Sequence, residues 1–278
     1  MSNNHLSKDK QIAVTAALAE DNSIRSIERM TGVHRDTIMR LGVRIGQGCA
    51  RLLDEKMRGL DCQRIELDEI WSYIGKKMAH VREDDDQTLG DVWTDCAIDA
   101  ETKLVPAYKV ASRRNIPTTI EFIDLKSRMN NRIQISSDAM NAYSEAIDFM
   151  FGRDVDYAQI VKTYGTEDSK YNNPERKYSP SRITGSEEIW MQGRPEAKYV
   201  STSYVERLNA STRLHVKRLN RLTLDFSKKL QNFEAAVSLH FAVYNLVRPH
   251  SSLKMTPAMA AGVERNFWSY GDLVEAVL

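Results

Sequence analysis

The spacing of apolar residues changes its period near residue 64, and this change constrains the fold more than any other feature of the chain. Before it, Ile24, Ile27 and Met30 recur every third residue, as in a helix that packs on one face. After it, residues 64–74 (RIELDEIWSYI) alternate with a period of two and are rich in β-branched and aromatic side chains. We therefore expect helices at the start of the chain and a sheet after them.

From residue 64 to residue 164, predicted strands and helices follow in the order strand, strand, strand, helix, strand, helix, strand. Mixed sheets with helices on their faces have this alternation, and the ribonuclease-H-like fold has this order in particular. The predicted fold class is therefore α/β: a ribonuclease-H-like mixed sheet with flanking helices, preceded by a small all-α helix-turn-helix domain. The predicted strands are 64–74, 92–99, 103–111, 132–136 and 157–164, and the predicted helices are 117–129 and 141–152.

The spacing in residues 23–51 is that of a helix-turn-helix. A tight turn at 31–33 precedes a second helix over 34–45, and Arg35, Thr37 and Arg40 point away from the apolar face near its start. Base edges and phosphates are met at this part of a reading helix in the major groove of DNA. We predict that these three residues contact DNA. The alternative is a plain helical hairpin with a solvated basic face.

The remaining segments complete the predicted domain organisation. Residues 165–198 are rich in Gly, Ser, Asn, Pro and charges, which favours an inserted basic and polar loop, and residues 199–232 read as helix. The predicted domains are a helix-turn-helix domain (1–60), a catalytic domain in two pieces (61–164 and 199–250), the inserted loop (165–198) and a C-terminal extension (251–278).

The composition is that of an ordinary folded protein, with 42% hydrophobic and 28% charged residues and a net charge of +1. That charge is distributed unevenly: residues 1–64 carry +3, 65–164 carry −6 and 201–278 carry +4. Cys49, Cys62 and Cys96 form no CxxC pair, so we expect free thiols. No apolar run approaches the roughly 20 residues of a membrane span, and we expect a cytoplasmic, nucleoid-associated protein without a membrane partner.

Three carboxylates stand out by position. Asp68 lies inside an apolar strand, where an unpaired ionised group would cost several kcal/mol. Asp138 ends the fourth predicted strand, and it emerges at the same edge as Asp68 if the first and fourth strands are adjacent and parallel. Glu206 begins the helix after the long loop. Such oxygen ligands suit two Mg²⁺ or Mn²⁺ ions, which would promote in-line displacement at a phosphodiester.

Local structural roles are the alternative for two of these acids. Residues 203–206 fit a capping box with Ser203 as N-cap and Glu206 reaching back to its amide. Asp138 is suited to be the N-terminal capping residue of the helix that follows it. Asp68 has no equally good structural role. Glu66, Glu69 and Asp99 are lesser candidates, with Asp99 expected in a turn.

The helix from Glu206 carries further polar residues on the same face. Asn209, Arg213 and Lys217 follow at helical spacing, which suits a helix beside a phosphodiester backbone, and we predict that they contact DNA. The alternative is an ordinary solvated face.

The order and spacing of several motifs resemble the insertion sequence 1 family (InsAB-type) of DDE transposases. The motifs are LDEIWSYIGKK, AIDAETKLVPAY, SSDAMNAY and YVERLNASTRLHVKRLNRLTLDFSKKL. The resemblance implies a metal-binding acidic triad of Asp68, Asp138 and Glu206, and a helix-turn-helix that recognises terminal inverted repeats. The cysteine zinc motif common before that helix-turn-helix is missing from this chain, and the loop before Glu206 is longer.

These observations predict a DNA transposase that binds the inverted repeats of an insertion sequence and catalyses metal-dependent strand cleavage and strand transfer. Its expected partner is double-stranded DNA, bound by a homodimer or higher oligomer because two element ends must be joined. The alternative function is a DNA-binding regulator or inactive derivative that uses the same fold as a scaffold.

Overall fold

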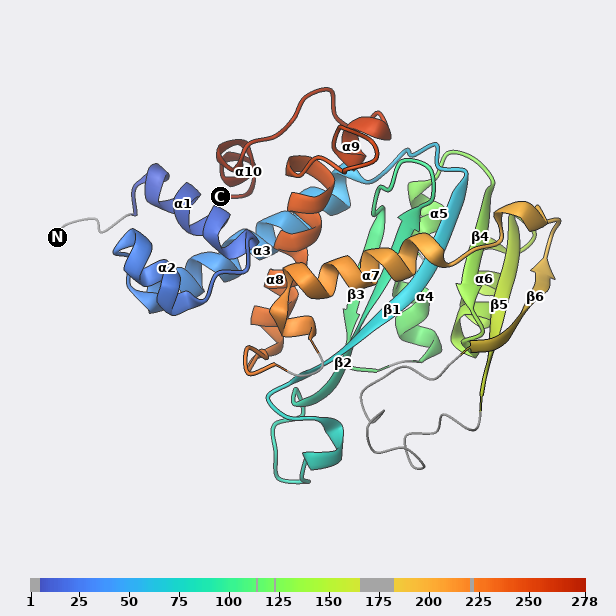
Figure 1. Ribbon diagram of the computed structural model, residues 1–278, viewed down its shortest axis with the longest axis horizontal. Coiled ribbons are helices and arrows are strands. Elements are labelled where there is room, and N and C mark those ends of the chain that lie inside the picture. The colour runs from blue at the N-terminus through green and yellow to red at the C-terminus, as the bar shows by residue number, and fades with distance from the viewer. Residues whose placement is uncertain (1–5, 114, 123, 166–182, 221–222) are drawn as a thin grey trace.

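A six-stranded mixed sheet forms the centre of the computed structural model, which describes residues 6–113, 115–122, 124–165, 183–220 and 223–278 (Figure 1). The strand order is β3-β2-β1-β4-β5-β6. β1 pairs antiparallel with β2 and parallel with β4, β4 pairs parallel with β5, and β5 pairs antiparallel with β6. The predicted mixed sheet with flanking helices is confirmed. The strands are β1 (Arg64–Ile74), β2 (Gly90–Asp99), β3 (Ala107–Ala111), β4 (Ile133–Asp138), β5 (Val155–Tyr164) and β6 (Ile183–Gln192).

Helices cover both faces of the sheet. On one face, α7 (Ser203–His215) packs across β1 and β2; on the other, α4 packs against β3 and α6 (Figure 1). β1 is buried on both faces because of this cover: Leu67 and Ile70 are fully buried, and so is most of Glu66. The helices of the second face are α4 (Ile116–Phe122), α5 (Leu125–Arg128) and α6 (Asn141–Phe151).

Three helices precede the sheet. They are α1 (Lys8–Ala19), α2 (Ile24–Thr31) and α3 (Arg35–Lys56). Gly32 ends α2 with a φ of 67°, a left-handed conformation that glycine adopts without strain, and the His34 imidazole accepts from the Asp36 amide at the start of α3. The turn between two helices falls where the sequence predicted it. Helix α3 is longer than expected, because it continues eleven residues past Ile45 to Lys56.

The second half of α3 packs against the C-terminal helices. At Gly46, an added Cβ would lie 2.3 Å from the Ala235 carbonyl oxygen, so only glycine allows this approach to α8 (Leu230–Ala242). α9 (Pro257–Ala260) and α10 (Tyr270–Val277) follow a π-helical turn (Val243–Val247), and α10 packs on α1 and α3. A single apolar core runs from Val14 to Val277 across the predicted domain boundary at residue 60.

Several predicted elements differ from the structure. The strand expected over 103–111 begins only at Ala107, and the helix expected over 117–129 is divided into α4 and α5. The segment 165–198, expected as a loop, contains the edge strand β6 and a short 3-10 turn (Ala197–Tyr199); its first part, 166–182, lies outside the described residues. The helix expected over 199–232 ends at His215 and is followed by a 3-10 turn (Lys217–Leu219). None of the helices in the described ranges combines the length and apolar character that crossing a bilayer requires.

Candidate active site

The parallel pairing of β1 with β4 brings Asp68 and Asp138 to one edge of the sheet. The register runs from Arg64 opposite Gln134 to Leu67 opposite Ser137, and the next residue on each strand is one of the two aspartates. This placement follows from the parallel register: β4 ends at Asp138, and β1, which continues to Ile74, carries Asp68 at the neighbouring position. The sequence prediction for this pair therefore agrees with the sheet.

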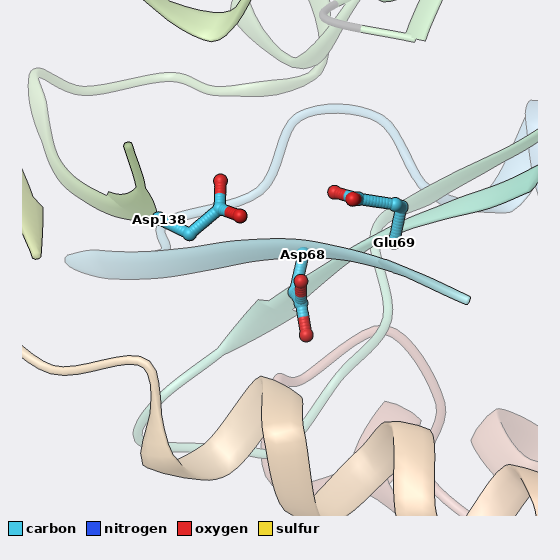
Figure 2. Close-up of side chains that lie close together, drawn as sticks. All are labelled: Asp68, Glu69 and Asp138. Carbon is cyan, nitrogen blue, oxygen red and sulfur yellow. The ribbon is translucent and has the colours of Figure 1, made fainter. Parts of the chain in front are cut away.

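Glu69 joins the two aspartates. Each of Asp68, Glu69 and Asp138 offers one carboxylate oxygen, and these oxygens lie within 4.8 Å of one another. In Figure 2, Glu69 and Asp138 lie on one side of β1, whereas the Asp68 side chain points to the other side, toward α7. The Tyr143 hydroxyl donates to Glu69 Oε2 at 3.4 Å. Hard oxygen donors at this spacing fit Mg²⁺ or Mn²⁺.

The environment of Asp68 disfavours its ionised form. Burial raises the pKa of Asp68 to about 6, and repulsion from Asp138 and Glu206 adds to the rise. Two donors oppose it: the Glu69 amide and the Asn209 side-chain amide, whose Nδ2 donates to Asp68 Oδ2 at 2.8 Å. A cation bound beside Asp68 would remove this cost, because it favours the carboxylate over the neutral acid.

Glu206 lies on the first turn of α7 and lines the same cleft as Asp68 and Asp138. Its carboxylate accepts from the Lys162 ammonium of β5 and, at 2.7 Å, from the Thr202 hydroxyl. Burial alone would raise the pKa of Glu206, but these bonds and the charge of Lys162 lower it instead. Glu206 is not in the 4.8 Å group, so two of the three predicted ligands meet and the third lies on the wall of their cleft.

The predicted capping box at the start of α7 does not form. The amides of Tyr204 and Val205 donate to Glu66 Oε2 of β1 at 2.7 and 3.0 Å, so a buried acid of the sheet caps the helix. The N-cap residue is Thr202. The capping box of Ser203 and Glu206 is thus wrong, and the Glu206 carboxylate instead accepts from Lys162 and the Thr202 hydroxyl.

Two other acids have local hydrogen bonds. Asp138 Oδ1 accepts from the amide of Met140, the N-cap residue of α6, at 3.1 Å. Asp99 Oδ2 accepts from the amide and hydroxyl of Thr102, which confirms its expected turn role. The bond to Met140 orients Asp138, which lines the cleft.

The residues predicted to contact DNA fall into two environments. Arg35 and Arg40 are exposed on the first turns of α3, and Thr37 beside them is half-buried. On α7, Asn209 is buried against Asp68, an environment that the polar-stripe interpretation did not foresee. Further along that stripe, Arg213 is half-buried, and the exposed Lys217 donates to Asp21 from its backbone amide and its ammonium group.

A large groove runs between α2, the start of α3 and the segment before α8. Arg40 lines it together with cations that the sequence analysis did not single out. Phosphate backbones bind in grooves where cations outnumber acids. The cations are Arg25, Arg40, Arg44, Arg218, Lys228 and Lys229, and the acids are Asp21, Asp36 and Asp225.

No protein-family model and no curated protein matches this chain. Among solved structures, a simian T-cell lymphotropic virus intasome in complex with PP2A regulatory subunit B56 gamma is similar over 75% of this chain and 57% of that chain, with 13% identity and a TM-score of 0.40. A piggyBac transposase synaptic complex with hairpin DNA matches over 100% of this chain and 66% of that one, with 10% identity and a TM-score of 0.31. The Mos1 strand transfer complex matches over 87% and 79%, with 10% identity and a TM-score of 0.22. All three are distant.

Proposed function

We propose that this protein is a metal-dependent DNA transposase of the insertion sequence 1 type, which cleaves DNA strands at element ends and joins them to a target. The observation that carries the proposal is the meeting of Asp68, within β1, and Asp138, at the end of the parallel neighbour β4, with Glu206 on the wall of the same cleft. The strand order β3-β2-β1-β4-β5 is the order expected of a ribonuclease-H-like catalytic domain.

The donor set of the cleft suits divalent cations. Its acids are hard oxygen ligands, and the ammonium of Lys162 already lies among them as a cation. Two bound Mg²⁺ or Mn²⁺ ions would promote attack by water or by a DNA 3′-hydroxyl and stabilise the leaving oxygen. Asp68, Asp138 and Glu206 are the ligands that we assign, and Glu69 is the competing third acid.

Side chains and one backbone amide of the protein prepare this cleft before any ion binds. Asn209 orients Asp68, the Met140 amide orients Asp138, and Lys162 holds Glu206. Glu66 anchors the first turn of α7 to β1, which keeps the helix that carries Glu206 and Asn209 beside the strand that carries Asp68. Positioning of this kind is most of what a protein contributes to phosphodiester displacement.

DNA is the substrate in this proposal. Residues 1–60 would recognise the terminal inverted repeats through Arg35, Thr37 and Arg40, and the groove lined by Arg40 would hold the phosphate backbone. Arg213 and Lys217 would contact DNA near the catalytic domain. A homodimer or higher oligomer would hold both ends of an element, and the protein would work at the nucleoid.

The alternative of a regulator with an inactive scaffold accounts less well for Asp68. A pKa of about 6 means that its carboxylate is costly at neutral pH, and a chain without use for a cation site would gain stability by losing it. Retaining Asp68, Asp138 and Glu206 in one cleft favours the enzyme.

Strand transfer of the element's flanking ends tests the proposal. With Mg²⁺, the wild type should join the ends to a target DNA, and Asp138→Asn should lower the rate by about a hundredfold or more, the scale on which a positioned electrostatic group acts in catalysis. Asp148→Asn, which changes an exposed aspartate of α6 outside the cleft, is the matched control and should keep wild-type activity. Full activity of Asp138→Asn would overturn the proposal.

A further inference from the structure

Lys162 is the one cation among the described residues that line the acidic cleft. It projects from β5, its side chain is 23% exposed, and its ammonium bonds to the Glu206 carboxylate on α7. The two residues are 44 positions apart and belong to different layers of the fold. Their ion pair therefore joins the sheet to α7 across the cleft.

The position of the ammonium relative to the acids is informative. Asp68, Asp138 and Glu206 give the cleft three carboxylates, and within the described lining only Lys162 carries the opposite charge. A carboxylate in contact with an ammonium cannot offer the same oxygen to a metal ion at full strength, since both cations seek the same lone pairs. In this arrangement Glu206 is committed to Lys162 while the aspartates face the cleft.

We propose that Lys162 is a positioning residue that serves as the internal counter-ion of Glu206, and that a divalent cation must displace its ammonium to recruit Glu206 as a ligand. This inference rests on the proposed function of the cleft. It makes Lys162 and the ion competitors for one carboxylate, so Lys162 weakens ion binding and stabilises the ion-free protein.

If Lys162 and the metal ion compete for Glu206, removing the ammonium should lower the stability of the metal-free protein and raise its affinity for Mn²⁺. In Lys162→Met, the carboxylates lose their counter-ion, so the melting temperature without metal should fall. The same variant should bind Mn²⁺ about fivefold tighter or more, the lower end of typical coupling between two ligands of one site, because no ion pair has to break. Mn²⁺ should therefore raise the melting temperature of Lys162→Met by more than that of the wild type.

The experiment is titration calorimetry with Mn²⁺ on the full chain, together with thermal unfolding in EDTA and in Mn²⁺. The matched control is Lys76→Met, which breaks the ion pair of Lys76 with Asp85, both of them residues outside the cleft lining. It should leave Mn²⁺ affinity unchanged and change the melting temperature equally in both buffers. Lys162→Arg keeps a cation and should stay near the wild-type affinity, and Lys162→Gln is a second neutral variant if the methionine variant folds poorly.

Combining the change with Glu206→Gln tests the route through Glu206. In that background the carboxylate is absent, so Lys162→Met should gain much less Mn²⁺ affinity than it does alone. Two results would overturn the inference while leaving the proposed function intact. The first is a full gain of Mn²⁺ affinity in the Glu206→Gln background. The second is Mn²⁺ binding by Lys162→Met and Lys162→Gln that is equal to or weaker than that of the wild type. Failure of the wild type and all variants to bind Mn²⁺ would overturn both.

Discussion

Asp68 and Asp138 lie on adjacent strands, whereas Glu206 lies on a helix that packs across them, and the two settings hold a carboxylate differently. The register of β1 with β4 places the aspartates through backbone hydrogen bonds that no single side chain can undo. Glu206 depends on side chains, namely Lys162 and Thr202. The sheet half of this cleft is therefore set by backbone pairing, and the half on α7 depends on side-chain contacts.

Substituting Glu206 and Glu69 in turn identifies which of the two acids is the third metal ligand, and this difference should exceed those that follow. Glu206→Gln should lower Mg²⁺-dependent strand transfer by about a hundredfold or more, because the amide is a poorer ligand for a hard cation. Glu69→Gln should stay within about threefold of the wild type on the same scale. Rates of strand transfer by the two variants, compared at equal DNA binding, check this. A reversed order would make Glu69 the third ligand and place the whole site on the sheet.

Asp68→Asn should stabilise the metal-free protein at high pH. The pKa of Asp68 is about 6 in the fold and near 3.8 when unfolded, so the folded state binds more protons between these values and loses stability as pH rises through them. Above pH 6 the full cost applies, about 3 kcal/mol from the two pKa values. The asparagine variant escapes that cost and can still accept from Asn209.

Urea unfolding in EDTA at pH 4 and pH 8 measures this difference. Asp68→Asn should exceed the wild type at pH 8 and approach it at pH 4, where Asp68 keeps its proton in the folded state and is partly protonated in the unfolded state. Asp148→Asn should show no such dependence. An Asp68→Asn protein less stable than the wild type at pH 8 would mean that the ionised aspartate is well compensated, contrary to the cost that burial imposes on it.

Removing the Glu66 side chain should lower the free energy of unfolding much more than removing that of Glu206, because Glu66 is far more buried. Glu66 is 3% exposed and accepts from two amides of α7, so Glu66→Ala should cost roughly 2 kcal/mol by leaving both donors without a partner. Glu206→Ala breaks a half-exposed ion pair and the bond from the Thr202 hydroxyl, and should cost about 0.5 kcal/mol. Urea unfolding of both variants checks this, and equal losses would restore a structural role for Glu206.

The smallest effect concerns the groove and not the cleft. Arg40 lines the basic groove, whereas Arg35 is exposed on the same helix without lining it. Arg35→Ala and Arg40→Ala should each weaken binding to the element's ends by about 1 kcal/mol, roughly fivefold, and leave metal-dependent nicking of generic DNA intact. Binding assays with end DNA and random DNA distinguish base contacts from phosphate contacts. Unchanged binding to both DNAs would remove the helix-turn-helix interpretation.

The sequence predicted the sheet half of the site because its signals are local. The alternation in residues 64–74 marks β1, and the end of the next parallel strand marks Asp138, so the placement needs only strand order. It failed at β6, whose residues are almost all exposed on both faces, because a strand with no buried face shows no apolar alternation. It also failed at the capping box. Four adjacent residues matched that motif, but Glu66 on a distant strand accepts the amide hydrogen bonds at the start of α7.

Local patterns in the sequence are enough to identify the candidate acidic ligands on β1, on β4 and at the start of α7, and the turn that separates α2 from α3. These follow from patterns within a few residues, which backbone geometry converts directly into helices, strands and their ends. Only the tertiary structure decided the partners, among them Lys162 for Glu206, Asn209 for Asp68 and Glu66 for the amides of α7. Partners up to 141 residues apart are chosen by the packing of α7 across the sheet, and no local pattern encodes that packing.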